Sequence, residues 1–170
     1  MSLKEIIKNK GFVKKSHNFY NSEDFFSLAK TGNKDIERLL ESNMQLAFDV
    51  DEQQMTGLHW AAREGHPYIC KILLQKYRAN VGARDIYGRT PLHLAVMNKN
   101  SECIIRIFIE GGQLGAMNKD KKSVRMVAPD SYTKYLLEKL EEIKFVIKTK
   151  TMKKSEEREL LEESIRNALD

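Results

Sequence analysis

Two histidines stand in the same short phrase at two places in the chain, and each could take part in metal or acid–base chemistry. The phrase TGLHWAA contains His59, and the phrase TPLHLAV contains His93. A cysteine follows each of them, at Cys70 and Cys103. Imidazole and thiolate are ordinary zinc ligands, and histidine is the commonest general base. The pattern therefore fits a metal site, a catalytic site or one structural unit written twice.

The spacing of these residues argues against a metal centre. Zinc sites are usually built from close ligand pairs such as C-x-x-C or H-x(3–5)-H, and the chain contains neither pair. Cys70 is expected on the buried side of a helix, and Cys103 in a turn between helices. The glycine-rich stretch EGGQLGAM (110–117) lacks the G-K-[ST] ending of a phosphate-binding loop. We therefore expect no catalytic residue, no metal and no cofactor.

A repeat explains the two phrases better. Similar segments begin at Asp51, Asp85 and Asp120, which lie 34 and 35 residues apart. Residues 25–42 also align on the segment that follows His59, with Gly32 matching Gly65. The chain thus reads as four units of about 33 residues with degenerate first and last copies. A period of this length is typical of a stacked solenoid.

Each full unit carries the signals of a helix pair. Thr56 and Thr90 are suited to N-cap positions, and the histidine three residues later can return a hydrogen bond, as Glu does in a capping box. Thr56, His59, Thr90 and His93 are therefore predicted to be structural capping residues. Apolar residues at helical spacing follow and predict a second helix. Metal binding or catalysis by the histidines remains the alternative.

These residues resemble the ankyrin repeat, whose pattern runs D-x-x-G-x-T-P-L-H-x-A-A-x-x-G-H. DIYGRTPLHLAV and MTGLHWAAREGH carry the resemblance, which extends over about residues 22–140. It implies an all-α ankyrin-repeat solenoid of stacked helix pairs with hairpin loops. Two departures are expected to matter. Lys99-Asn100 replaces Gly-His, which predicts a rebuilt turn with one extra residue near Cys103. The last unit has lost T-P-L-H altogether.

The resemblance also implies where a protein partner binds, on the concave side formed by hairpin tips and inner-helix ends. Ile86 and Tyr87 are apolar at a tip that should be polar, as in the core of an interface. Tyr87 packing on the next hairpin is the alternative, and Trp60 is open to the same two interpretations. The expected concave residues are Gln53, Met55, Arg63, Glu64, Ile86, Tyr87, Arg89, Met97 and Asn98.

The two ends of the chain are the second expected binding region. We divide the chain into a basic N-terminal arm (1–20), a repeat domain (21–140) and a charged amphipathic extension (141–170). One apolar stripe outlasts the final repeat, and a further amphipathic helix follows it. That helix either folds back or docks on another protein. The residues proposed for docking in the extension are Ile143, Ile147, Leu161, Ile165 and Leu169.

The composition of the chain limits the classes of function that we expect. The net charge is +5, but the basic segments lack interleaved aromatics and a nucleic-acid motif, so nucleic-acid binding is not expected. No apolar run is long enough to span a membrane, and two cysteines are too few for a disulfide framework. We expect a non-enzymatic structural or adaptor subunit of a larger intracellular eukaryotic assembly, with protein partners. A cytoplasmic location is expected, with a ciliary, cytoskeletal or organellar site left open. A free regulatory or chaperone-like protein that uses its groove is the alternative.

Overall fold

The computed structural model describes residues 21–148 and 154–169, so the basic N-terminal arm (1–20) lies outside the described residues. Within these ranges the chain forms eight α-helices and two 3-10 helices, which confirms the expected all-α solenoid. The helices are α2 (Ser22–Thr31), α3 (Ile36–Ser42), η1 (Met44–Phe48), α4 (Gly57–Glu64), α5 (Pro67–Gln75), α6 (Pro91–Met97), α7 (Ser101–Ile109), η2 (Arg125–Val127), α8 (Ser131–Lys148) and α9 (Lys154–Leu169).

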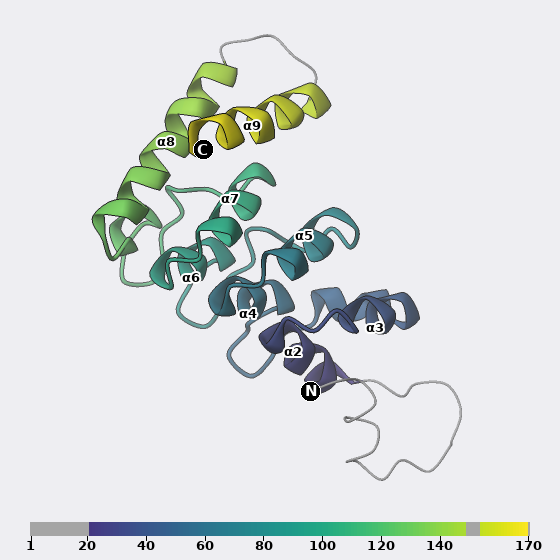
Figure 1. The fold of residues 1–170 in the computed structure, drawn as a ribbon. Helices are drawn as coiled ribbons and strands as arrows, with labels where there is room; N and C mark the ends of the chain where they lie inside the picture. The colour runs from purple at the N-terminus through teal and green to yellow at the C-terminus, as the bar shows by residue number, and fades with distance from the viewer. Residues whose placement is uncertain (1–20, 149–153, 170) are drawn as a thin grey trace, which may run out of the picture.

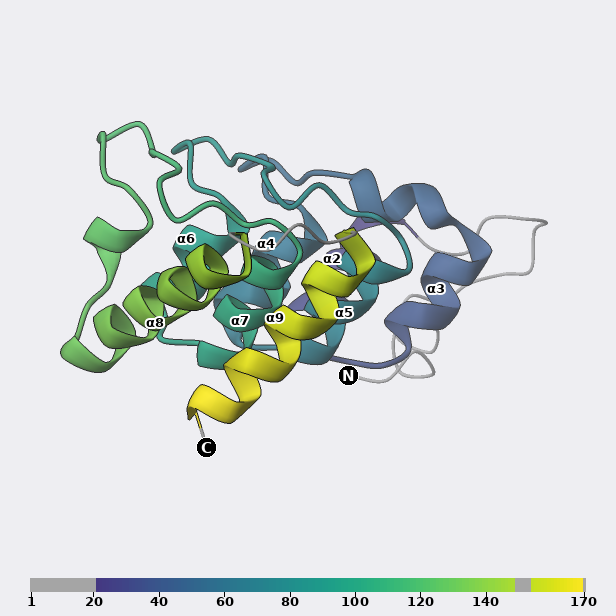
Figure 2. The same ribbon diagram turned by 90° about the horizontal axis from the view of Figure 1, so that it is seen from above.

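The helix pairs stack side by side in chain order. Figure 1 shows α2, α4 and α6 in one row and α3, α5 and α7 in a second row. α4 packs between α2 and α6, while α5 packs on α7. The loops that join successive pairs lie along one edge of the helices (Figure 2). Each pair therefore covers the apolar side of its neighbour, as a solenoid requires.

The core runs between the two rows. Ala61 and Ala95 are fully buried, and their small side chains allow the inner helices to lie close together. Larger side chains fill the space toward the outer row, among them Leu58, Ile69 and Ile104, all fully buried. Burying one such side chain stabilises the fold by about 1.5–3 kcal/mol. The inner helices are thus held in place by neighbours on both sides.

The turn after α6 differs from the sequence expectation. Lys99 adopts a left-handed conformation, with φ +60°, where the preceding unit has Gly65 with φ +79°. The turns close in the same way: the amides of His66 and Asn100 donate to the carbonyls of Ala61 and Ala95, both at 2.9 Å. The turn is therefore not rebuilt, and Cys103 lies buried on α7 instead of in a loop.

Hydrogen bonds offset the cost of this left-handed lysine, which is about 1–2 kcal/mol. Asn100 donates from its side-chain amide to the carbonyls of Ala62 and Arg63, each at 2.9 Å, at the end of α4. The ammonium of Lys99 pairs with Asp130 at 2.9 Å. Interactions across units thus keep the glycine-like turn without glycine.

The last unit also keeps more of the pattern than expected. Asn118 accepts from the amide of Lys122 at 2.9 Å, as Asp85 accepts from the amide of Arg89 at 2.8 Å. Asn118, and not Asp120, therefore holds the fourth hairpin. The hydroxyl of Ser123 accepts a hydrogen bond from the amide of Met126 at 3.4 Å, as the hydroxyl of Thr90 does from the amide of His93. The side-chain contact of the cap is thus kept at Ser123, although Val124 is the N-cap of η2, and Met126 stands where the histidine would be.

The C-terminal extension folds back on the chain. The expected boundary at residue 140 falls inside α8, which continues to Lys148, and α9 then packs against α8 and α7. Ile147, Leu161 and Ile165 are buried in the core. Arg158 on α9 pairs with Glu110 at 2.8 Å. Ile147, Leu161 and Ile165 therefore cover the end of the solenoid and are not exposed to a partner in this structure, whereas Leu169 is 37% exposed.

Candidate protein-binding face

The capping pairs hold the hairpins to the helices. The amide of Thr56 donates to Nδ1 of His59 at 3.1 Å, and the Thr90 amide does the same to His93 at 3.1 Å. The opposite ring nitrogen then faces the next unit: Nε2 of His59 lies 3.1 Å from the carbonyl oxygen of Arg89. Nε2 of His93 lies 3.3 Å from the carbonyl of Lys122. Each imidazole therefore joins two units.

This geometry fixes the protonation state of both rings. Because Nδ1 accepts a backbone N–H, the proton sits on Nε2, which donates to the carbonyl of the next hairpin. Burial lowers the pKa of His59 and of His93 below the ordinary value of 6.5. Both rings are neutral and use both nitrogens, so neither has a lone pair left for a metal or a substrate.

The cysteines offer no reactive site either. Cys70 and Cys103 are both free and buried. A hydrogen bond with Cys103, together with burial, raises the pKa of the Cys70 thiol well above its usual range. Within residues 21–148 and 154–169, no group of three or more His, Cys, Asp or Glu side chains is placed to hold a metal ion.

Backbone hydrogen bonds tie the hairpin tips into one row. The amide of Ile86 donates to the carbonyl of Gln53 at 3.0 Å, and the amide of Lys119 donates to the carbonyl of Tyr87 at 2.9 Å. The tips of units two, three and four are therefore joined by backbone hydrogen bonds into a single ladder. When Asn118 is aligned with Asp85, the carbonyl of Asp120 in the last tip corresponds to the accepting carbonyls of Gln53 and Tyr87.

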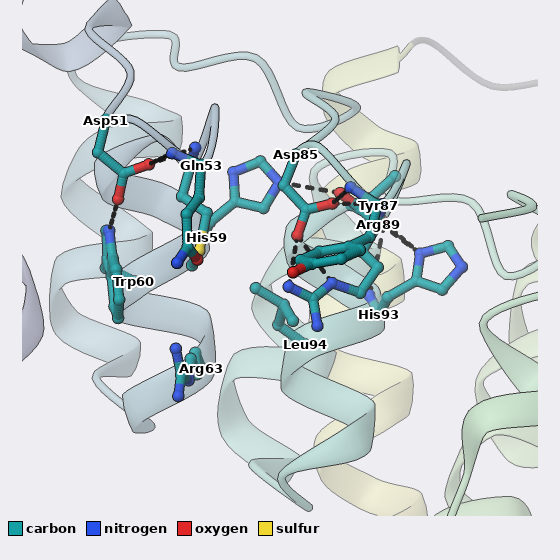
Figure 3. A network of polar contacts seen from close by, with 12 residues as sticks. Asp51, Gln53, His59, Trp60, Arg63, Asp85, Tyr87, Arg89, His93 and Leu94 are labelled. Carbon is teal, nitrogen blue, oxygen red and sulfur yellow. Dashed lines mark hydrogen bonds and ion pairs between the residues drawn. The ribbon is translucent and has the colours of Figure 1, made fainter. Parts of the chain in front are cut away.

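Trp60 lies on α4 beside the row of tips. Its indole Nε1 donates to Asp51 at 2.8 Å (Figure 3), which fixes the ring against the second hairpin. The ammonium of Lys30 lies 3.8 Å from the centre of the ring, and the guanidinium of Arg63 lies 5.1 Å from it. Trp60 is half-buried and packed on the core, in agreement with the packing interpretation, while its role as an anchor for a partner stays a prediction.

Tyr87 is the aromatic side chain at the third tip. It is 52% exposed, and the guanidinium of Arg89 lies 4.6 Å from its ring centre. Arg89 is in turn held by Asp85 through its Nε at 2.7 Å (Figure 3). Ile86 beside it is 38% exposed. The apolar pair thus stands outside the core on a rigid, hydrogen-bonded turn.

The other expected concave residues divide into two groups. Gln53 at the second tip is exposed, as are Arg63, Glu64, Met97 and Asn98 at the ends of α4 and α6. Met55 is fully buried, because it precedes the N-cap Thr56 and points under the hairpin. We use the name hairpin face for the surface along the row of tips, which comprises Lys30, Gln53, Trp60, Arg63, Glu64, Ile86, Tyr87, Met97, Asn98 and the fourth hairpin (118–126).

Sequence reasoning missed three contributors to this surface. Lys30 lies on α2 at the position that brings it over Trp60, 30 residues further along the chain. Met126 replaces the capping histidine in the last unit and is 68% exposed, since no further hairpin follows within residues 21–148 and 154–169 to cover it. Lys119 follows Asn118 and therefore matches Ile86 in the ladder. Met126 and Lys119 could have been found in the sequence by aligning Asn118, instead of Asp120, with Asp85.

Hollows in the surface lie elsewhere. One of about 520 Å³ is lined by Phe108, Leu114, Phe145 and neighbouring residues between α7 and α8. Another, of about 300 Å³, lies between α7 and α9. The hairpin face is instead an open, rigid surface, which suits an extended or folded polypeptide better than a small molecule.

Comparison with known proteins agrees with this architecture. Residues 58–106 match the family model for ankyrin repeats (many copies). Inversin from Canis lupus familiaris is 36% identical over 76 residues, which is 44% of this chain and 7% of that protein. A Caenorhabditis elegans homolog of transient receptor potential cation channel subfamily A member 1 is 35% identical over 89 residues, or 52% of this chain and 7% of that protein.

A longer match is found in fungi. Palmitoyltransferase AKR1 from Lachancea kluyveri is 30% identical over 139 residues, or 79% of this chain and 18% of that protein. The chain therefore spans less than a fifth of the length of each of these three relatives. None of the helices in the described part of the chain is long and apolar enough to cross a membrane.

Proposed function

Because this chain is an ankyrin-repeat protein, we propose that it binds another protein through the hairpin face and acts as a structural or adaptor subunit of a larger assembly. Ankyrin repeats are a protein–protein interaction module, as the family match indicates. The observation that carries the proposal is Ile86 and Tyr87: two exposed apolar side chains on a turn that is fixed by Asp85.

The rigidity of this turn supports the proposal. Asp85 accepts from the amides of Tyr87 and Arg89 at 2.9 and 2.8 Å, and the ladder joins the turn to the hairpins on both sides. A surface that is ordered before binding loses little conformational entropy when a partner arrives. Tyrosine and arginine are also common among the residues that dominate binding energy.

We propose that the role is non-enzymatic. The match to a protein named palmitoyltransferase covers 18% of that protein, so its activity does not transfer with the match. His59 and His93 use both ring nitrogens in the fold, and Cys70 and Cys103 are buried. These engagements favour binding over catalysis. A cytoplasmic, cytoskeletal or ciliary setting stays a prediction.

A free regulatory protein is the second candidate, and one observation favours it. The apolar stripe of the C-terminal extension packs on the chain's own helices, with Leu161 and Ile165 buried. This removes the reason to expect that the extension wraps onto a neighbouring subunit. Both candidates use the hairpin face, and they differ in whether the protein stays in a stable particle.

Crosslinking of the native protein with a lysine-reactive reagent, followed by mass spectrometry, tests the proposal. We expect links to a partner from lysines on or beside the hairpin face, namely Lys30, Lys119, Lys121 and Lys122. Lys71 on α5 and Lys134 on α8 are exposed on other helices and serve as internal controls. Links that come only from the control lysines would reject the hairpin face. Recovery of one stoichiometric particle would favour the subunit over the free regulator.

A further inference from the structure

Positive charge gathers at one end of the hairpin face. The fourth hairpin carries Lys119, Lys121 and Lys122, all exposed, against one carboxylate, Asp120. We call these three lysines the basic hairpin. Within residues 21–148 and 154–169, no carboxylate oxygen lies within 4.0 Å of the ammonium nitrogen of any of these three lysines. Their charge is therefore directed to the solvent.

Three of the other cations around the face are paired with a carboxylate of the chain, whereas Lys30 lies over the Trp60 ring and Arg84 donates to the carbonyls of Gly88 and Met117. Arg89 is held by Asp85 at 2.7 Å. Lys99 pairs with Asp130 at 2.9 Å, and Arg125 pairs with Glu141. The fourth hairpin is thus the place on the face where three cations without a carboxylate partner in the described part of the chain stand together.

The second hairpin, at the other end of the ladder, has the opposite character. Its tip carries Asp51, Glu52, Gln53 and Gln54, with no cation among them. By position in the ladder, Glu52 matches Ile86 and then Lys119. The residue at this position therefore changes from acidic to apolar to basic from the second tip to the fourth. The two ends of the hairpin face thus differ in charge, and a bound partner can be oriented by them.

Apolar side chains lie between and beside these two ends. Ile86 and Tyr87 stand at the middle tip, and Met97 at the end of α6 is 42% exposed. Met126 lies on η2, which packs beside α6. Methionine and tyrosine side chains make adaptable contacts with other apolar side chains. The face thus offers an apolar middle that leads into a cationic end.

We propose that the hairpin face binds a polypeptide segment whose apolar residues lie on Ile86, Tyr87 and Met97 and whose acidic end lies on the basic hairpin. The inference rests on the proposed function and adds the chemistry and the direction of the partner. Carboxylates of the partner pair with Lys119, Lys121 and Lys122, which steers the encounter and sets the orientation. A polypeptide is favoured over nucleic acid because the apolar pair at the third tip belongs to the same ladder as the lysines.

A library of random 12-residue peptides, selected on the full chain, tests this inference. We expect the enriched peptides to carry aliphatic or aromatic residues followed or preceded by a cluster of Asp and Glu. A synthetic peptide with the enriched sequence should lose at least about tenfold in affinity for the Lys119→Glu/Lys122→Glu variant, because several exposed ion pairs become repulsive. Its affinity should also fall as salt is raised.

The matched control is Lys71→Glu/Lys134→Glu, which changes the net charge equally on helices away from the face. This control should bind the peptide as the parent chain does. A photoreactive group on the acidic end of the peptide should attach to residues 117–126, and one on the other end should not. Attachment in the reverse direction would overturn the proposed orientation.

The outcomes separate this inference from the proposed function. Enriched peptides without an acidic bias, but lost in the Ile86→Ala/Tyr87→Ala chain, would overturn the inference and keep protein binding at this face. A library that yields nothing above the Ile86→Ala/Tyr87→Ala chain would overturn both. If the lysine variant instead loses binding to a single-stranded RNA oligonucleotide or to phosphatidylserine vesicles, and peptides are indifferent to it, the partner is not an acidic polypeptide.

Discussion

The Nε2 atom of His59 lies 3.1 Å from the carbonyl oxygen of Arg89, so the side chain that caps one helix also fastens the hairpin of the next unit. His93 repeats the arrangement toward Lys122 at 3.3 Å. The tips that present Ile86 and Tyr87 are therefore held from below by neutral imidazoles. The order of the hairpin face depends on these two rings.

This dependence predicts that stability falls in mild acid. Burial keeps the pKa of both imidazoles below 6.5 in the folded chain, so the unfolded chain binds more protons between the two values. The stabilisation is complete above pH 6.5 and is lost as pH falls below it. Each ring contributes a loss of at most about 1.4 kcal/mol per pH unit. Urea unfolding at pH 7.5 and pH 5.5 measures this difference.

A variant identifies the source of the pH effect. In His93→Gln, one of the two rings is gone, so the difference in unfolding free energy between the two pH values should shrink by about half. Carboxylates such as Asp130, whose pKa the hydrogen bond from the Thr133 amide lowers to about 2, stay ionised over this range. Equal stability of the parent chain at pH 7.5 and 5.5 would contradict the neutral, doubly bonded histidines.

A left-handed glutamine offers a second prediction. Gln54 has φ +57° at the position where the next hairpin has Gly88 with φ +71°. Gln54→Gly should stabilise the fold by about 0.5–1 kcal/mol, since glycine adopts this conformation without steric cost. Gln53→Gly, one residue earlier at an ordinary φ, is the control and should lower stability. If both variants change the unfolding free energy alike, Gln54 does not occupy the left-handed position of this hairpin.

Trp60 gives a third prediction because it is the single tryptophan. With Lys30 at 3.8 Å and Arg63 at 5.1 Å from the ring, anionic iodide should quench its fluorescence more strongly than cationic caesium. Replacing the cation in Lys30→Gln should lower iodide quenching by about twofold at low salt, because the local anion concentration falls. Lys34→Gln is the control, because the Lys34 ammonium lies 5.2 Å from the centre of the Tyr68 ring and not over Trp60. Unchanged quenching in Lys30→Gln would place Lys30 away from the ring in solution.

The fold-back of α9 gives a fourth prediction. Leu161 is 5% exposed against the core, so Leu161→Ala should destabilise the protein by about 2 kcal/mol or more. Leu169 near the end of α9 is 37% exposed, and Leu169→Ala should stay within about 0.5 kcal/mol of the parent. Thermal or urea unfolding distinguishes these results. Equal effects of the two variants would mean that α9 does not pack on the solenoid.

The sequence predicts the parts of this fold that depend on local chemistry. A threonine followed three residues later by histidine defines a cap within one helical turn, so the local phrases locate the starts of α4 and α6. The spacing of Asp51 and Asp85 likewise gives the period. These interactions join residues that are neighbours in the chain, and one sequence contains everything needed to recognise them.

The expectations from the sequence that were wrong concern positions where one residue type takes over the structural role of another. Asn118 accepts a backbone hydrogen bond as Asp85 does, yet the nearby Asp120 resembles the expected residue more closely. Lys99 occupies a glycine-like turn because Asn100 and Asp130 stabilise it from other units. The outer helix of the second unit begins at Pro67, and that of the third begins 34 residues later at Ser101. Keeping the repeat period of 34 residues through this turn would have placed Cys103 on α7.

The position of α9 could not be derived from the sequence. Its apolar stripe shows that Leu161 and Ile165 need a partner, but periodicity does not say which surface covers them. In the structure the surface is supplied by α7 and α8, with Arg158 joined to Glu110. The burial of Met55 was missed for a similar reason, because exposure at a tip depends on how adjacent hairpins pack.

The affinity of the crosslinked partner for a variant of the third hairpin tip measures how much this tip contributes to binding. Ile86→Ala/Tyr87→Ala removes the exposed apolar pair and leaves the backbone ladder, while Tyr68→Ala removes an exposed aromatic ring on α5. We expect the double variant to bind the partner at least about tenfold more weakly, and Tyr68→Ala to bind as the parent does. Equal affinity of the double variant and the parent would contradict binding at the hairpin face.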